Sequence, residues 1–218
     1  MNKALLIAMI LVAVTSCKQE CRIVTNRYSD GEELVVRVYP DCSDTTRYRR
    51  IALYPDGKPG SEGFIERGKK NGKFKTWYTN GQLSADWEVV DNLGHGVVNC
   101  WYENGQLKST VRVNMDLQEG PFRQWWDDGK LHAEGEFVKG KQSGVWKYWK
   151  QDGRLVQRTY KDGIMHGPTI EVIEGGVKVS GQYANAKEQG KWTWADSLGR
   201  LTREVVYEKG EVVSEKEY

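Results

Sequence analysis

Three histidines and four cysteines are the side chains of this 218-residue sequence best suited to metal or covalent chemistry. His95 and His166 occupy the same place in a repeated pattern, just before a glycine and three repeats apart. In a β-sheet built from two-stranded repeats they would lie roughly 30 Å apart, which is too far to share a metal ion. Other repeats fill this place with the polar residues of a turn: Asn71, Glu119, Ser143 and Gln189. We therefore expect no metal site and no cofactor.

The motifs of the common enzyme classes are also missing from the sequence. It contains no Gly-x-Ser-x-Gly, no phosphate-binding loop, no dinucleotide fingerprint and no His-Glu-x-x-His. Acidic pairs such as Asp127-Asp128 recur as ordinary turn and strand residues, and none stands out as a glycosidase pair. The net charge is +2 with both signs mixed along the chain, whereas nucleic-acid binding favours a clustered basic stripe. We predict neither an enzyme nor a nucleic-acid-binding protein.

A repeat organises the rest of the chain. The phrase TWYTNGQLSA at 76–85 returns as CWYENGQLKS at 100–109. Turn glycines preceded mostly by Asn or Asp recur every 24 residues and then every 23, at Gly57, Gly81, Gly105, Gly129, Gly153, Gly176 and Gly199. Asn-Gly and Asp-Gly between apolar runs are the strongest local signal for a β-hairpin, because these residues tolerate positive φ.

A second glycine series marks a second turn in each repeat, at Gly72, Gly96, Gly120, Gly144, Gly167 and Gly190. Each repeat is then a strand, a tight turn, a strand and a looser turn, with each of these glycines beginning an outgoing strand. The sequence predicts an all-β fold: an elongated, single-layer antiparallel sheet of about eight stacked hairpins, curled by sheet twist into a trough. We expect a capping hairpin at 17–48, the repeats at 49–210 and an edge strand at 211–218.

Aromatic residues recur beside the first turn. One tryptophan lies four residues before the glycine in each of four repeats, at Trp77, Trp101, Trp125 and Trp149. One interpretation is structural, since a single-layer sheet needs large rings to bury its surface. The other is that part of the row, together with Tyr78, Tyr102 and Trp126, is exposed and stacks on a sugar or grips a peptide, because exposed apolar patches mark binding sites.

The N-terminus has the features of a targeting segment. Lys3 precedes an apolar run from Ala4 to Val14, which is too short to span a bilayer as a helix. The following Val-Thr-Ser-Cys resembles the bacterial lipobox, which implies removal of residues 1–16 and attachment of lipid to Cys17. The alternative is an ordinary secretory peptide cut at the same place. Because position 18 is not Asp, the resemblance implies sorting to the outer membrane.

Cys21 and Cys42 are expected to form a disulfide. Two apolar runs between them surround Ser29-Asp30-Gly31 and predict a hairpin, and the two cysteines lie almost symmetrically about its turn. An exported protein meets an oxidising compartment, where such a bond persists. It would add about 3 kcal/mol in the chain-entropy description. Two free thiols are the alternative.

The repeat pattern G-x-W/F-x-x-W-Y-x-N-G-x-L resembles the MORN-repeat variant of many bacterial proteins. The resemblance covers Ile51 to about Tyr207 well and Cys21–Tyr48 loosely, and it weakens after Gly167, where Val172 replaces the tryptophan. It implies a hairpin-repeat architecture. Some bacterial relatives are antitoxin components, and eukaryotic MORN proteins are often membrane or scaffold proteins. We expect a non-catalytic envelope lipoprotein that binds another envelope protein; the alternatives are glycan binding or an antitoxin or immunity role.

Overall fold

The computed structural model describes residues 21–27 and 33–218. The predicted signal segment, Cys17 and the Ser29–Gly31 turn therefore lie outside the described residues. Among the residues described, no helix has the length and apolar character needed to span a bilayer. The chain divides into two compact units, which are considered separately: residues 1–106 with 113–116, and residues 107–112 with 117–218.

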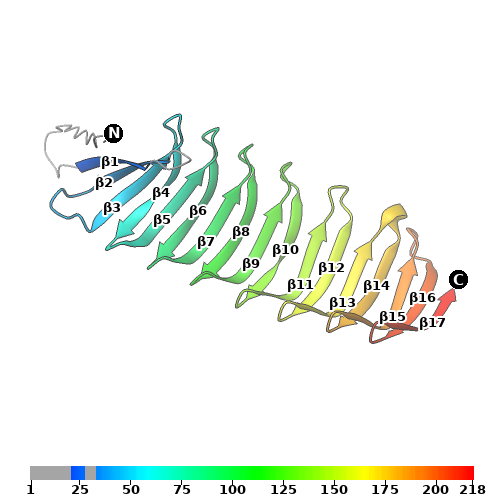
Figure 1. Ribbon diagram of the computed structural model, residues 1–218. Helices are drawn as coiled ribbons and strands as arrows, with labels where there is room; N and C mark the ends of the chain where they lie inside the picture. Colours follow the sequence, from blue (N-terminus) through cyan, green and yellow to red (C-terminus); the bar gives the residue numbers. More distant parts are fainter. Residues whose placement is uncertain (1–20, 28–32) are drawn as a thin grey trace, which may run out of the picture. The chain divides into compact units, whose positions relative to one another are not determined.

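Seventeen strands in one open antiparallel sheet make up nearly all of the described chain (Figure 1). Wherever a register is defined, from β1 to β7 and from β9 to β17, paired strands follow one another in sequence. This confirms the predicted all-β fold of hairpin repeats, with η1 (Glu174–Gly176) as a short 3-10 turn. The strands are β1 (Cys21–Arg27), β2 (Glu33–Tyr39), β3 (Arg47–Leu53), β4 (Pro59–Glu66), β5 (Lys69–Trp77), β6 (Leu83–Val90), β7 (Leu93–Trp101), β8 (Leu107–Asn114), β9 (Leu117–Trp125), β10 (Leu131–Val138), β11 (Lys141–Trp149), β12 (Leu155–Lys161), β13 (Ile164–Val172), β14 (Lys178–Ala184), β15 (Lys187–Ala195), β16 (Leu201–Glu208) and β17 (Glu211–Glu217).

In the hairpins of Gly57, Gly81, Gly105, Gly129 and Gly153 the first turn is a three-residue loop closed by the Asn or Asp before the glycine. Between β5 and β6 the backbone N–H of Gly81 donates to the carbonyl of Tyr78 at 2.9 Å, and the N–H of Gln82 donates to Asn80 Oδ1 at 2.8 Å. The left-handed conformation falls on the glycine, as the sequence predicts: φ is 86° at Gly105 and 84° at Gly129. The preceding Asn or Asp contributes through its side chain, not through a positive φ of its own.

The second turn differs from the prediction. It is a tight two-residue turn in which both residues have positive φ, as at Asp91 (51°) and Asn92 (74°), which is typical of a type I′ hairpin. The second glycine series does not begin the strands, because β5 already starts at Lys69. Gly72 (φ 82°) lies inside β5 where the register with β4 is interrupted, so it is a β-bulge.

These bulges direct a large ring onto a glycine of the preceding strand. In the first unit the ring of Phe74 covers Gly63 so closely that a Cβ at position 63 would overlap it. Phe74 also stacks on Trp87 with ring centroids 5.9 Å apart, and packs with buried Ile65 and Val89. This cluster is the core of the first unit.

The second unit repeats the same arrangement twice. Trp146 covers Gly135, and Trp192 covers Gly181. Trp146 is only 2% exposed, and its Nε1–H donates to the carbonyl of Glu136 at 3.1 Å. The most buried rings, such as Phe74 and Trp146, therefore lie three residues before the tryptophans singled out in the sequence, Trp77 and Trp149. Members of that tryptophan row are half-buried, and the greatest burial falls on the ring three residues earlier, a position that the sequence analysis did not single out.

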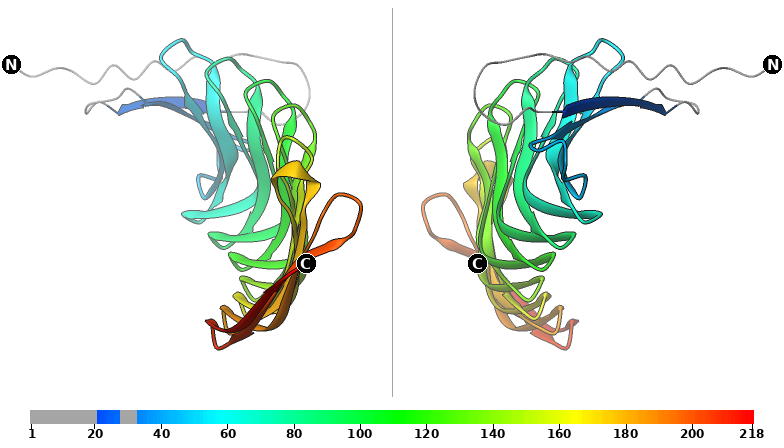
Figure 2. Two further views of the ribbon diagram at one scale, coloured as in Figure 1. Left: turned by 90° about the vertical axis from the view of Figure 1, so that its right-hand side faces the viewer. Right: turned by 90° about the vertical axis from the view of Figure 1, so that its left-hand side faces the viewer.

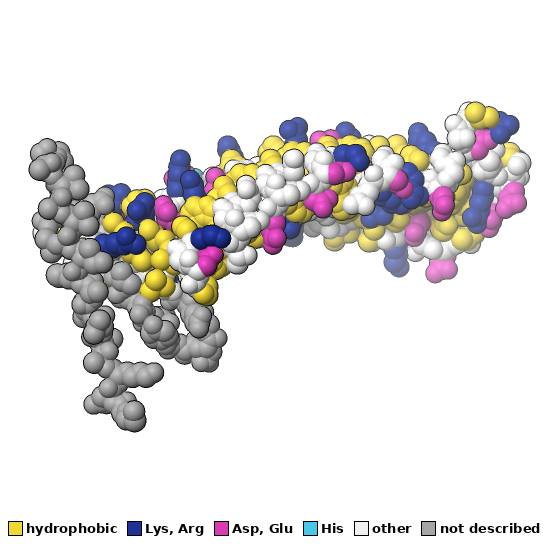
Figure 3. Space-filling model, turned by 90° about the horizontal axis from the view of Figure 1, so that it is seen from above, with side chains coloured by type: hydrophobic (Ala, Val, Ile, Leu, Met, Phe, Trp, Pro, Cys, Tyr) yellow, Lys and Arg dark blue, Asp and Glu magenta, His cyan; other side chains and the backbone are white. Residues whose placement is uncertain are grey.

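The two faces of the sheet differ in character. In the second unit the face opposite Trp146 carries a ladder of charges, with Glu134 between Arg123 (3.8 Å) and Lys147 (3.2 Å). Such exposed pairs contribute little stability, but they keep this face hydrated. In the end views of Figure 2 the strands of each unit form one layer. Seen from above in Figure 3, apolar side chains are interspersed with charges of both signs.

Candidate functional site

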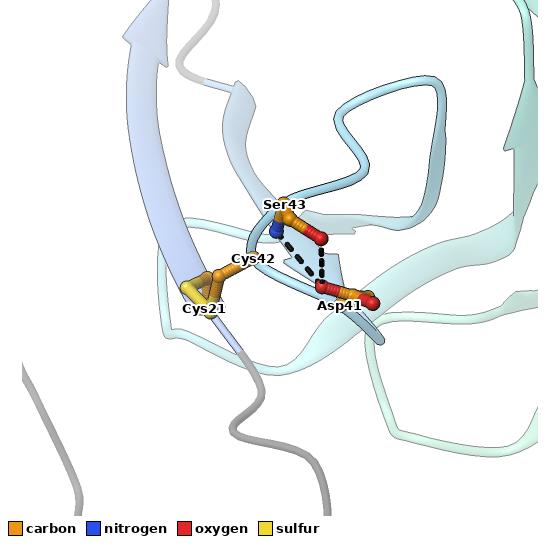
Figure 4. Close-up of a disulfide and its surroundings, with 4 residues drawn as sticks. All are labelled: Cys21, Asp41, Cys42 and Ser43. Atoms are coloured by element: carbon orange, nitrogen blue, oxygen red, sulfur yellow. Dashed lines mark hydrogen bonds between the residues drawn. A yellow bond between two sulfur atoms is a disulfide. The ribbon is translucent and has the colours of Figure 1, made fainter.

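Cys21 and Cys42, the cysteines paired in the sequence analysis, are joined by a disulfide in the first unit (Figure 4). Their Cα atoms lie 5.3 Å apart. Cys21 begins β1 opposite Tyr39, and Cys42 lies in the turn after β2. Beside Cys42, the hydroxyl of Ser43 donates to Asp41 Oδ1 at 2.6 Å, which closes the turn. The bond therefore ties the first strand to the turn that leads into β3.

The strongest candidate for a binding site is a hollow of about 650 Å³ in the second unit. It lies where the turn after β9 approaches the adjoining ends of β11 and β12. Aromatic, polar and basic side chains line it: Trp126, His132, Tyr148, Trp149, Lys150, Gln151, Val156, Arg158 and Tyr160. Of the seven aromatic residues predicted to bind, the structure brings Trp126 and Trp149 together here.

The other predicted aromatic residues are distributed over both units. Trp77, Tyr78, Trp101 and Tyr102 are half-buried residues of the first unit. Trp125 belongs to the second unit and is half-buried at the end of β9, but it does not line the hollow. The seven residues do not form one site.

Two of these aromatic residues also join successive repeats. The hydroxyl of Tyr78 donates to the main-chain carbonyl of Trp101 at 2.8 Å, and Trp126 Nε1–H donates to the carbonyl of Trp149 at 3.1 Å. Tyr54 makes the equivalent contact with the carbonyl of Trp77 at 2.5 Å. We call this contact the inter-repeat clamp. At these positions the aromatic side chain has a structural task in addition to any binding role.

His132 forms one wall of the hollow. Its ring stacks on Trp126 with centroids 3.7 Å apart. Burial lowers the pKa of His132, because the charged imidazolium loses hydration there. The imidazole is therefore neutral near physiological pH. The sequence analysis expected no metal site at any of the three histidines and did not foresee that His132 stacks on an aromatic ring.

Tyr148 and Tyr160 form the floor of the hollow beside Trp146. Their rings lie 6.0 Å and 6.4 Å from the Trp146 ring. The Tyr148 hydroxyl accepts from Gln142 Nε2 at 2.9 Å and donates to the Tyr160 hydroxyl at 3.5 Å. Burial, and then the hydrogen bond with Tyr160, raises the pKa of Tyr148, so this hydroxyl stays protonated.

Two cations reach the hollow, and they differ in their partners. Lys150 Nζ lies 3.2 Å from Glu171 Oε1. Arg158 is half-buried and stands opposite Trp146 in the strand register. Across the part of the chain that the structure describes, no ion pair or hydrogen bond involves the Arg158 guanidinium. Sequence reasoning missed Arg158, since nothing in its immediate surroundings separates it from other strand cations.

The lining of the hollow offers ring faces, hydroxyls, a neutral imidazole and cations. In residues 21–27 and 33–218, no group of three His, Cys, Asp or Glu side chains gathers in a way that could hold a metal. The hollow can therefore hold an apolar group that carries a negative charge or hydrogen-bond acceptors.

Comparison with known proteins identifies the repeat. The sequence description of the MORN repeat variant matches three consecutive segments, residues 70–90, 94–114 and 118–139. Each segment corresponds to one hairpin: β5–β6, β7–β8 and β9–β10. No curated protein matches the chain closely enough to count as a relative.

Proposed function

We propose that this chain is a non-catalytic binding module of the cell envelope, which holds a partner protein on the aromatic face of its repeat sheet. Its three matching MORN-variant repeats suggest a repeat-based binding or scaffold module. The aromatic face is defined by the rings that share the side of Trp146, with the hollow as its most concave part. The single observation that carries the proposal is the hollow, where half-buried rings surround a floor formed by Tyr148 and Tyr160.

The physical basis is the one-layer construction. A sheet with one apolar face normally buries that face against a second layer. Here the rings bury one another, as Trp146 does with Phe122 at 5.4 Å and Phe137 at 4.9 Å, and some apolar surface stays accessible. Accessible apolar surface with hydrogen-bonding groups at its rim is the usual composition of a protein-binding patch.

Location forms the second part of the proposal. We propose that Cys17 is the mature N-terminus and carries lipid that anchors the chain to the outer membrane. The Val-Thr-Ser-Cys sequence supports this, and a Cys21–Cys42 disulfide suits an oxidising compartment. Cys17→Ser should move the protein from the membrane fraction to the soluble fraction. An unmodified Cys17 in the mass spectrum of the wild-type protein would contradict the anchor.

The binding role is tested by affinity capture from solubilised membranes with a matched pair of variants. Trp149→Ala removes a ring of the hollow but keeps the main-chain carbonyl that the clamp uses. Trp77→Ala removes the ring at the same repeat position in the first unit. A genuine partner should be captured by the wild type and by Trp77→Ala, and lost with Trp149→Ala. Retention of the same partners by Trp149→Ala, with its circular dichroism unchanged, would refute binding through the hollow.

Glycan binding is the second candidate, favoured by the rings of Trp126 and Trp149 beside Gln151 in the same hollow. A glycan array probed with the wild type and with Trp149→Ala separates the two functions, since only glycan binding gives a signal that this variant abolishes. An immunity-type role is a special case of protein binding in which the partner is a toxin acting at the envelope. The identity of the captured partner decides that question.

A further inference from the structure

The repeats differ in length at the hollow. Gly129 and Gly144 are 15 positions apart, whereas Gly153 and Gly167 are 14 apart. The registers show where the residue is lost. In β10, Leu131 pairs with Trp125 and Ala133 with Gln124, so His132 is bulged between them. In β12, Leu155 and Val156 pair with Trp149 and Tyr148 without a bulge.

This missing residue changes which side chain faces the aromatic side. The fifth residue after the turn glycine is Glu134 in the longer repeat, and it lies on the charged face beside Lys147. In the shorter repeat the fifth residue is Arg158, which stands opposite Trp146. A one-residue shift moves a strand residue to the other face of a sheet. Arg158 therefore takes the place that one residue in the second strand of each hairpin occupies at the level of the large rings. Where registers are defined, the other residues at this place are uncharged: Gly63, Trp87, Gly135, Gly181 and Val205.

The strand after Arg158 also differs from its equivalents. Gly135 and Gly181 are each covered by a tryptophan of the following strand. In the strand that follows Arg158, the residue opposite it is Thr169, at the position of those tryptophans. Thr169 is 6% exposed, and its hydroxyl donates to the Gln157 carbonyl at 2.9 Å. A small side chain stands where Phe74, Trp146 and Trp192 stand in other strands. Arg158 itself lines the hollow.

No carboxylate pairs with Arg158 among the described residues, where its charge acts on the hydroxyls of Tyr148 and Tyr183. The nearest acidic residue on the same face in the neighbouring strand is Glu171, and its carboxylate pairs with Lys150 at 3.2 Å. Arg203 lies over the Trp194 ring at 4.9 Å, but no such ring contact involves Arg158 among the residues that the structure describes. A half-buried guanidinium with no acceptor is a strong binder of a carboxylate, which it can hold through two parallel hydrogen bonds.

We infer that the hollow binds a carboxylate group of the partner protein, with the Arg158 guanidinium as its recognition group. This inference rests on the proposed protein-binding function and specifies its chemistry. A protein carboxylate fits better than an acidic sugar, because one face of Trp126 is covered by His132 at 3.7 Å and its N–H is held by the clamp. Val156 lines the hollow two residues before Arg158 on the same face, so the wall beside the cation is apolar.

The probes are N-acetyl-tryptophan, which carries a carboxylate and a ring, and N-acetyl-tryptophan amide, which lacks the charge. Binding of each to the mature wild-type chain is followed by nuclear magnetic resonance of the arginine Nε–H and tryptophan Nε1–H signals. The carboxylate should bind about tenfold more tightly than the amide, as expected for one charged hydrogen-bonding partner. Arg158→Gln should remove this preference, and Lys147→Gln on the opposite face should preserve it.

Three results would overturn the inference. Equal affinities of the wild type for the two probes would exclude a carboxylate site without the need for any variant. A preference that persists in Arg158→Gln would exclude Arg158 as the recognition group. Arg158-dependent binding of glucuronate without binding of N-acetyl-tryptophan would assign the carboxylate to a sugar. In each case, capture of a protein partner that is lost with Trp149→Ala would leave the proposed function intact.

Discussion

Replacing Gly135 with alanine tests how the aromatic core is built. Gly135 has ordinary strand φ, so alanine itself fits the backbone. The added Cβ, however, would overlap the ring of Trp146. Because Trp146 is 2% exposed, the ring has to move outward to relieve the overlap. We therefore expect a substitution that normally stabilises a strand to destabilise this protein.

The size of the effect follows from the contacts of Trp146. Exposing about a quarter of a ring of roughly 200 Å² costs about 1.3 kcal/mol. Loss of the hydrogen bond from Nε1 to the Glu136 carbonyl adds about 1 kcal/mol. Replacing glycine with alanine restores about 0.5 kcal/mol through the entropy of the unfolded chain. The net loss is about 2 kcal/mol, or roughly 4 to 8 °C in Tm for a protein of this size.

A double-mutant cycle isolates the contact. In the Trp146→Val background the overlap is absent, so Gly135→Ala should be neutral or slightly stabilising, giving a coupling of about 2 kcal/mol in urea unfolding. Another pair of strands in the chain already has the large and small residues interchanged. Trp87 of β6 corresponds to Gly135, and Val98 of β7 corresponds to Trp146. Gly153→Ala is the reference, because a Cβ there contacts nothing within 4 Å and meets only a positive φ of 86°, which costs about 1 kcal/mol.

The expected order of unfolding free energies is therefore wild type, then Gly153→Ala, then Gly135→Ala. An unchanged or raised stability of Gly135→Ala, or equal effects of Gly135→Ala in the presence and absence of Trp146, would refute the packing of the ring on the glycine.

Three further predictions concern the disulfide, the repeat and one ionisable group. Non-reducing peptide mapping should recover Cys21 linked to Cys42, and alkylation of both thiols in the native protein would contradict the bond. Deleting residues 96–119 removes one whole repeat and should be tolerated far better in thermal melts than deleting residues 96–100, which disturbs the alternation of faces; the reverse order would exclude modular hairpins. The pKa of His132 should lie below 6.5 by nuclear magnetic resonance, because burial favours the neutral ring. Since the unfolded chain then takes up the proton first, stability should decrease as the pH falls through the unfolded pKa of about 6.5 toward the lower folded pKa, and the His132→Phe variant should lose that dependence.

The hairpin architecture could be predicted because its signals are local. Asn-Gly and Asp-Gly each define a turn by themselves, and Gly105 and Gly129 have the predicted positive φ. The second turn could not be read in the same way. In different repeats its two left-handed positions are filled by residues such as Met115 and Ala186, which carry no turn signal. The glycine expected to mark this turn, as at Gly72, lies instead in a bulge within a strand. Tertiary pairing, rather than residue preference, sets the conformation there.

The hollow was beyond prediction for a related reason. The spacing of glycines shows that the repeat containing Arg158 is one residue shorter, but not which residue has been lost. Only the registers locate the loss at the bulge that His132 fills in the preceding repeat. The face of every later residue in the strand depends on that position. The aromatic row was visible in the sequence, but its two hollow-lining members, Trp126 and Trp149, could be chosen only after the registers were known.

The inter-repeat clamp has a consequence for how such a chain can change its length. Its acceptor is always a main-chain carbonyl, at Trp77, Trp101 and Trp149, and only its donor depends on the side chain. Any residue can supply the acceptor, so a repeat inserted after a donor such as Tyr78 finds a partner whatever its own sequence. Donors can likewise change type, since tyrosine hydroxyls and the indole of Trp126 make the same contact. The clamp is thus indifferent to the sequence of its neighbour, and the matching that an exchanged repeat still requires is that of its ring with the glycine of the preceding strand, as between Trp146 and Gly135.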